Sequence, residues 1–409
     1  MKKSILRKYA NLLVCKGINV QPGQYVEILA SLDQPEFVQM CVEEAYKRKA
    51  ALVQVRWSYQ PIKKIVVNKT KEKILSQYDS ETEIIWKNRR DRLSCMLYIL
   101  SDDPDGLKGI NQEKLQSSTQ AMMKYVKPIR NEMENKYQWC IAAVPSVAWA
   151  RKIFPSETKT QAVNKLWDAI LYASRVTLDP IKAWEDHNAD LKKRCDYLNS
   201  LNLEYLHYTS KSNGTNLRVG MHPEALWCGG SEFALGSNIE FNPNIPSEEC
   251  FTSPLKGKAE GIVHSAKPLS YNGEIIDNFW IEFKDGKASN WHADVNNDLL
   301  TKIITMDEGA AYLGETALIP FDSPISNSGL LFYNTLFDEN ASCHLAIGHG
   351  FTNVIKDYEK FTQKELIDKG INDSITHVDF MIGTKDFEIV GHTRDGKDVQ
   401  IFKNGNWAF

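Results

Sequence analysis

The sequence pattern changes close to residue 200, and this change constrains the fold more than any other feature. Before it, short apolar runs alternate with segments whose apolar residues recur at helical spacing. After it, short alternating segments are separated by dipeptides typical of hairpin turns. The chain has 409 residues, more than the roughly 250–300 that one hydrophobic core organises. We therefore expect two domains, at 1–190 and 191–409.

In the first domain, the apolar runs indicate strands and the segments between them indicate helices. The strands are expected at 25–30, 51–57, 93–100 and 137–144. Helices are expected near 5–14, 33–45, 61–77 and 110–134, and over 159–201 with a break at Asp179-Pro180. Strand, helix and strand joined by short links form right-handed crossovers, so the sheet should be mostly parallel. No glycine-rich phosphate-binding motif follows the first strand, which argues against a nucleotide site.

The second domain is predicted to be β-rich, with mainly antiparallel strands and one helix near 294–304. Its turn signals are dipeptides in which Asn or Asp precedes Gly, at 213–214, 272–273, 285–286, 395–396 and 404–405. Such turns connect neighbouring antiparallel strands. The expected fold class is therefore an α/β N-terminal domain followed by a β-rich α+β C-terminal domain.

The composition argues against several kinds of partner. The net charge of −3 gives no general attraction to nucleic acid or anionic lipids. The N-terminal residues superficially look like a signal peptide, but Arg7, Lys8 and Lys16 interrupt the apolar region, and no run approaches the ~18 residues that span a bilayer. The eight cysteines form no CxxC pair, which indicates reduced thiols. We expect a cytoplasmic protein that binds neither nucleic acid nor membranes.

Clusters of metal-ligating residues lie in the C-terminal domain, and two of them supply carboxylates. Residues 244–252 contain the adjacent acids Glu248 and Glu249. Consecutive residues of an extended segment face opposite ways, so one of the two should reach a metal directly. We choose Glu249 as the ligand, and Glu248 is then a general base or a partner of the ligands. Glu315 lies within an apolar strand, so it must be paired, coordinated or at the sheet's rim, because an unpaired buried charge costs several kcal/mol.

Two further clusters supply imidazoles. His344 follows an acidic turn and precedes small residues, which suits a ligand oriented by neighbouring backbone. His377 and Asp379 are two positions apart, so on a strand they point to one face, about 6–7 Å apart. Such groups can converge on metals ~3.5–4 Å apart. The three carboxylates and two imidazoles suit two divalent cations and a bridging hydroxide.

The order of these motifs makes a resemblance specific. PSEECFT, LGE-AL-P, LFDENA-CH-A-G and HVDFMIG follow one another in the second half, and KYANLLV-GINVQPGQ lies near the start. Over nearly its full length the chain resembles the thermophilic-type metalloaminopeptidases, the family of aminopeptidases T and S and of PepS. The resemblance implies a homodimer that removes amino acids from peptides with free N-termini, with a two-metal site in the β-rich domain. The ligands it implies are Glu249, Glu315, His344, His377 and Asp379.

The types of ligand and the expected hydrolysis suggest a reaction mechanism. Zinc or cobalt fits the ligands best, and manganese or magnesium is also compatible. Glu248 or Glu315 would move a proton to the leaving amine. Members of the family usually have a tyrosine seven residues after the first histidine ligand, but this chain has Phe351 there. A tyrosine hydroxyl could donate a hydrogen bond to the oxyanion, and loss of such a donor commonly costs ~10²–10³ in rate.

Three interpretations of Phe351 remain open at this point. Catalysis could be slower, a nearby donor such as His349 or Tyr358 could replace the hydroxyl, or peptidase activity could be lost. The last case would leave a dimeric binding scaffold. Hydrolysis of another amide or ester by the same metals is a further alternative, because the fold alone does not specify the substrate.

Overall fold

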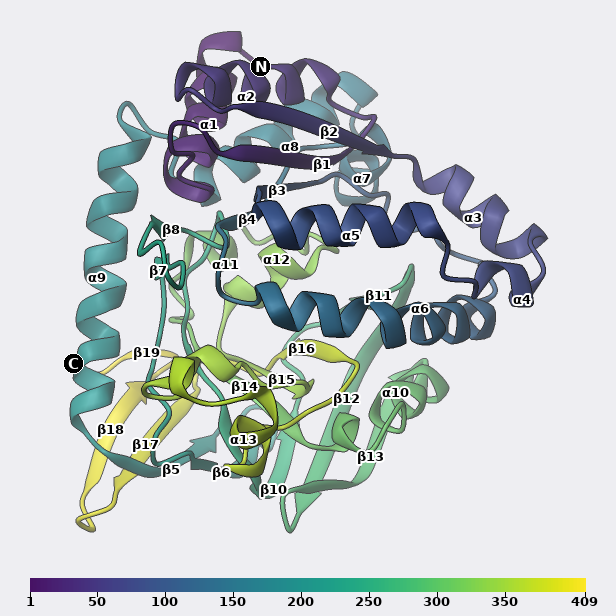
Figure 1. Cartoon of the computed structure of the whole chain (residues 1–409). Helices are drawn as coiled ribbons and strands as arrows, with labels where there is room; N and C mark the ends of the chain where they lie inside the picture. Colours follow the sequence, from purple (N-terminus) through teal and green to yellow (C-terminus); the bar gives the residue numbers. More distant parts are fainter. The chain divides into compact units, whose positions relative to one another are not determined.

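The computed structural model describes all 409 residues, shown in Figure 1. The chain forms two compact units, Met1–Asp186 with Ser231–Pro246, and His187–Gly230 with Ser247–Phe409. The expected division after residue 190 did not include the return of Ser231–Pro246 to the first unit. Within this segment, the backbone N–H of Asn242 donates to the carbonyl oxygens of Lys16 and Gly17, at 2.9 and 3.0 Å. Such long-range pairing has no local sequence signal.

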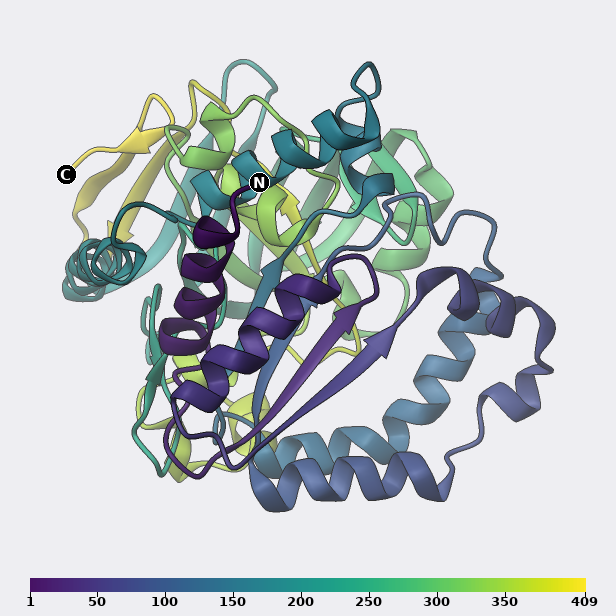
Figure 2. The same cartoon turned by 90° about the horizontal axis from the view of Figure 1, so that it is seen from above.

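The first unit contains eight α-helices, and a ninth begins there. They are α1 (Lys3–Leu12), α2 (Pro35–Lys47), α3 (Gln60–Lys69), α4 (Glu72–Leu75), α5 (Ser80–Arg92), α6 (Gln112–Met133), α7 (Val147–Ile153), α8 (Lys159–Ala173) and α9 (Pro180–Ser200), which continues into the second unit. Helices α5 and α6 lie side by side, as Figure 2 shows. No helix of the protein combines the length and apolar character needed to cross a membrane.

A four-stranded parallel sheet forms the centre of the first unit, as predicted. Its strands are β1 (Tyr25–Ser31), β2 (Leu52–Ser58), β3 (Cys95–Leu100) and β4 (Trp139–Ala143). Their order is β2-β1-β3-β4, and each neighbouring pair runs parallel. Figure 1 shows α1 and α2 on one face and α5 and α6 on the other. This is the arrangement that right-handed crossovers produce. A short hairpin of β7 (Glu232–Phe233) and β8 (Glu240–Phe241) completes the unit.

Helix α5 was not predicted from the sequence. It has no apolar stripe, and Arg89 is its only buried residue. A buried ion pair between Arg89 and Glu27 on β1 and several local interactions stabilise it instead. The side chain of Asp79 accepts a hydrogen bond from the Thr82 N–H at the N-terminus, and Lys87 pairs with Glu83 one turn earlier at 2.6 Å. A helix formed by capping and charge pairs is invisible to a search for apolar periodicity.

The second unit is β-rich and mainly antiparallel, as predicted. Its nine-stranded sheet has the order β11-β12-β10-β6-β5-β17-β18-β19, with β13 paired to β12. The strands are β5 (Leu203–Thr209), β6 (Asn216–Met221), β10 (Pro254–His264), β11 (Leu269–Tyr271), β12 (Glu274–Lys284), β13 (Lys287–Val295), β17 (Glu388–Thr393), β18 (Asp398–Lys403) and β19 (Asn406–Trp407). The helix expected near 294–304 is α10 (Asn297–Ile304).

A smaller antiparallel sheet packs against the nine-stranded one. Its order is β16-β15-β14-β9, with strands β9 (Cys250–Thr252), β14 (Leu313–Leu318), β15 (His344–Gly348) and β16 (His377–Met381). The two sheets share one core, in which the rings of Phe279 and Phe380 lie 5.7 Å apart. Short helices lie in the connections: α11 (Pro324–Asn327), α12 (Thr335–Asp338) and α13 (Gln363–Asp368).

A buried hydrogen bond joins the two sheets of this unit. The hydroxyl groups of Tyr208 on β5 and Thr316 on β14 lie 2.5 Å apart, and neither residue is exposed. Tyr208→Phe should lower the free energy of unfolding by about 1–3 kcal/mol, because the Thr316 hydroxyl is left unsatisfied. The double variant Tyr208→Phe/Thr316→Val should recover most of that loss in denaturant unfolding. A double variant less stable than Tyr208→Phe would contradict this account.

Candidate metal centre

Four of the predicted ligands lie on one face of the smaller sheet. Glu315 on β14 is opposite Ala346 on β15, which is opposite Asp379 on β16. His344 and His377 precede Ala346 and Asp379 by two residues, so they point to the same face. Ala346 contributes only a methyl group to the middle of this row. The sheet therefore brings two carboxylates and two imidazoles together around a small residue.

The ligand atoms form two groups that share Glu315. In the first, His344 Nε2 lies 3.6 Å from Glu249 Oε2 and 3.9 Å from Glu315 Oε1. In the second, His377 Nε2 lies 3.1 Å from both Glu315 Oε2 and Asp379 Oδ1. Within each group the three ligand atoms are within 4.8 Å of one another. Each oxygen of Glu315 thus faces a different imidazole.

Backbone carbonyl groups fix the orientation of both imidazole rings. His344 Nδ1 lies 2.9 Å from the carbonyl oxygen of Glu339, and His377 Nδ1 lies 2.8 Å from that of His349. A carbonyl oxygen only accepts, so each Nδ1 carries a proton and donates it. Each ring thereby turns its Nε2 towards the carboxylates, and in the neutral ring this nitrogen has the lone pair that a metal ion would bind. Metal-binding histidines have this arrangement.

The charges of the cluster also suit cations. Burial raises the pKa of Glu249 well above its usual value, and the charges of Glu315 and Asp379 raise it further. Burial opposes protonation of His377, but Asp379 and Glu315 hold its pKa well above the usual range. The ion pairs of Glu249, Glu315 and Asp379 are with histidines, not with Lys or Arg. Buried carboxylates with imidazoles and no basic side chain are a donor set that fits divalent metal ions.

The adjacent acids before β9 face different partners. Glu249 lies beside His344, whereas Glu248 Oε2 lies 3.9 Å from His187 Nε2 on α9. Both acids are buried, with 8% and 5% of their surface exposed. Glu249 thus lies within the cluster of candidate ligands, whereas Glu248 lies beside His187.

Glu339 is a further acid of the cluster that sequence reasoning missed. It begins the 3₁₀ turn η3 (Glu339–Ala341). Burial of its carboxyl group and the charges of Asp379, Glu249 and Glu315 raise its pKa well above the usual value. The available signal was its place in the LFDENA motif, five residues before His344. There it has the appearance of an ordinary acidic turn.

The proposed oxyanion donors lie in different surroundings. The His349 ring is one-third exposed, and its Nδ1 lies 3.5 Å from Asp373 Oδ1. Tyr358 packs on a separate small apolar cluster that contains Ile355, Leu366 and Ile371. By contrast, the Phe351 ring centroid lies 5.0 Å from that of His377. Phe351, where the family resemblance leads us to expect a tyrosine, therefore adjoins the candidate ligand His377.

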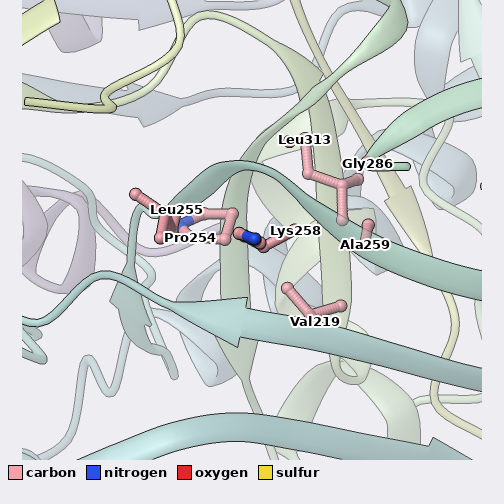
Figure 3. A pocket seen from close by; sticks show the side chains of 8 residues that line it. Val219, Pro254, Leu255, Lys258, Ala259, Gly286 and Leu313 are labelled. Carbon is pink, nitrogen blue, oxygen red and sulfur yellow. The ribbon is translucent and has the colours of Figure 1, made fainter. Parts of the chain in front are cut away.

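A shallow crevice elsewhere in the second unit has different chemistry. Figure 3 shows its lining, which consists of Val219, Pro254, Leu255, Gly257, Lys258, Ala259, Gly286 and Leu313. Lys258 is the one ionisable residue among them. The crevice therefore offers neither a set of metal ligands nor an acid–base pair.

Comparison with known proteins assigns the chain to a family. The model of the thermophilic metalloproteases (M29) matches residues 2–407. The chain belongs to the M29 metalloproteases. Aminopeptidase AmpS of Bacillus subtilis (strain 168) is 40% identical to this M29 protein, over 99% of this chain and 98% of AmpS. Aminopeptidase T of Thermus aquaticus is 32% identical, over 98% of each chain.

Structural similarity leads to the same family. The structure of wild-type AmpT from Thermus thermophilus matches with a TM-score of 0.90 and 32% sequence identity, over 100% of both chains. The family resemblance inferred from the sequence motifs is thus confirmed. As an M29 metalloprotease, the protein is a metal-dependent enzyme that hydrolyses peptide bonds.

Proposed function

We propose that this M29 protein is a two-metal aminopeptidase that releases amino acids from peptides with free N-termini. The proposal rests on one observation: two sets of candidate ligands, each with carboxylates and an imidazole, have Glu315 in common. The aminopeptidase names of the relatives from Bacillus subtilis and Thermus aquaticus support the substrate class.

The two groups define the proposed metal positions. Glu249, Glu315 and His344 would hold one ion, and Glu315, His377 and Asp379 the other. Zinc or cobalt suits this mixture of nitrogen and oxygen ligands, and manganese or magnesium is compatible with the oxygens. When bound, such a pair of ions activates a water molecule and polarises the scissile carbonyl group. Glu339 would add another carboxylate beside them.

The remaining acids have distinct proposed roles. Both oxygens of Glu315 face imidazoles, so it serves best as a shared ligand. Glu248 would then accept the proton of the attacking water and deliver it to the leaving amine. His349 would donate to the oxyanion less effectively than the missing tyrosine hydroxyl, because its ring is one-third exposed to water.

The proposal extends to domain, assembly and location. All candidate ligands lie in the second unit, which supports a catalytic metal-binding part within residues 191–409. The family resemblance supports a homodimer. All eight cysteines are free thiols, which supports a cytoplasmic location.

A panel of peptides tests the function. Protein loaded with zinc or cobalt should release successive N-terminal amino acids from unblocked peptides, and none from the same peptides after N-acetylation. Protein treated with a chelator should release none until metal is restored. Mass spectrometry of the products provides the measurement. Cleavage of internal bonds or esters, with unblocked N-termini left intact, would refute the aminopeptidase assignment.

A further inference from the structure

The segment Ser247, Glu248 and Glu249 has an unusual structural problem. It is buried, with 3%, 5% and 8% of each residue exposed, yet it belongs to no helix or strand. Buried backbone outside regular structure must obtain its hydrogen bonds from other groups. The groups that supply them here come from two distant parts of the second unit.

The first partner is His187 on α9. Its Nε2 lies 2.7 Å from the carbonyl oxygen of Ser247 and 3.9 Å from Glu248 Oε2. Because a carbonyl oxygen only accepts, Nε2 carries the proton and donates it. The side chain of His187 is 9% exposed. A single ring nitrogen thus holds the backbone of the segment and lies beside the carboxylate of Glu248.

The second partner is Asn340 in η3, which has no exposed surface. Its Oδ1 accepts a hydrogen bond from the Glu248 N–H at 2.7 Å. Its Nδ2 donates to the carbonyl oxygen of Leu336 at 3.0 Å and to Glu339 Oε1 at 3.4 Å. One amide therefore joins the segment that carries Glu249 to the turn that carries Glu339.

We infer that His187 and Asn340 are positioning residues that clamp the segment Ser247–Glu249 and thereby place Glu249 for metal binding. The inference rests on the proposed two-metal site. Neither residue is a proposed ligand: His187 lies outside the clusters recognised in the sequence, and Asn340 lies in the LFDENA motif, where sequence reasoning assigned it no role. The clamp acts from both sides of one short segment, so loss of either contact lets Glu249 move. Loss of the groups that orient metal ligands typically weakens binding by 10–100-fold.

Substitutions can separate hydrogen bonding from side-chain volume. His187→Phe keeps the ring and removes the donor, whereas His187→Gln keeps an N–H donor at a similar reach. Asn340→Leu removes all three hydrogen bonds at similar volume, whereas Asn340→Asp keeps only the acceptor for the Glu248 N–H. His207→Phe is the matched control, because His207 on β5 bonds to Asn216 at the exposed surface.

The test measures cobalt binding to the full-length protein. Calorimetry gives the affinity and the number of ions bound, and visible absorption reports the surroundings of the bound cobalt. We expect His187→Phe and Asn340→Leu to bind one of two cobalt ions 10–100-fold more weakly, with a changed spectrum. His187→Gln should bind within a few-fold of the wild type, Asn340→Asp should fall between wild type and Asn340→Leu, and His207→Phe should be unchanged. Thermal unfolding without metal checks that each variant is folded. If His187→Phe or Asn340→Leu is unfolded, the cobalt affinities of His187→Gln and Asn340→Asp relative to the wild type decide the test.

The outcomes distinguish the clamp from the proposed function. If the wild type binds two cobalt ions, and His187→Phe and Asn340→Leu bind them with the same affinity and spectrum, the clamp alone is overturned. If His187→Gln binds cobalt as weakly as His187→Phe does, the clamp is also overturned, because the N–H donor is then not the property that matters. Failure of the wild type to bind two cobalt ions would overturn the two-metal site, and the clamp with it.

Discussion

Glu315→Gln should abolish peptide hydrolysis, lowering kcat/KM by at least about 10³-fold, which corresponds to about 4 kcal/mol of transition-state stabilisation. Glu315 is the one residue that belongs to both groups of candidate ligands. Its two oxygens face different imidazoles, so its replacement weakens both proposed metal positions. Glutamine has the same size but no negative charge. The loss should therefore reflect chemistry and not packing.

Metal binding provides the second measurement for this variant. The wild type should bind two cobalt ions per chain, and Glu315→Gln fewer than two. A ligand at 1,000 times its Kd stabilises the folded state by about 4.1 kcal/mol, so the thermal shift that cobalt produces should largely disappear in the variant. Glu282→Gln, an exposed position on β12, is the matched control and should behave as the wild type. A Glu315→Gln enzyme with both ions and near-normal activity would remove Glu315 from the centre.

Strand periodicity explains why much of the candidate site could be predicted. His377 and Asp379 are two residues apart, and on a strand this spacing places both on one face. The structure has their ligand atoms 3.1 Å apart. Glu315 stood out as one charge within the apolar run LGETALIP, and the structure places it on β14, whose residues are all buried. Side chains of a strand alternate between its two faces with a period of two residues, and this local pattern can be read directly from the sequence.

The parts that were missed depend on contacts between distant residues. Glu339 has the appearance of a surface acid because its neighbours form a turn, and only the folded chain brings it to Asp379 and Glu249. His187 lies in a helix of ordinary composition, 60 residues before the segment it contacts. Neither spacing nor hydropathy encodes such a pairing. Helix α5 was missed for the opposite reason, since capping and charge pairs form it without an apolar stripe.

Phe351→Tyr should raise kcat by about 10²-fold with little change in KM. The centroid of the Phe351 ring lies 5.0 Å from that of the His377 ring, so a hydroxyl added to Phe351 would lie close to the candidate metal centre. A donor that meets the oxyanion only in the transition state changes kcat and not ground-state binding. Removing one such donor typically costs 10²–10³. The backbone should stay in place, because Ser253 Oγ accepts from the Phe351 N–H at 2.8 Å.

Kinetics on a fluorogenic aminoacyl substrate separate the three interpretations of this position. Phe233→Tyr, at an exposed site on β7, controls for the added hydroxyl. A large gain in Phe351→Tyr alone means that the wild type has no oxyanion donor as effective as the tyrosine hydroxyl. An active wild type without a gain means that another group donates, and His349→Phe should then lower kcat. No turnover in either protein, with metals bound, would favour the binding scaffold, since the ligands would then be retained without the chemistry that they usually support.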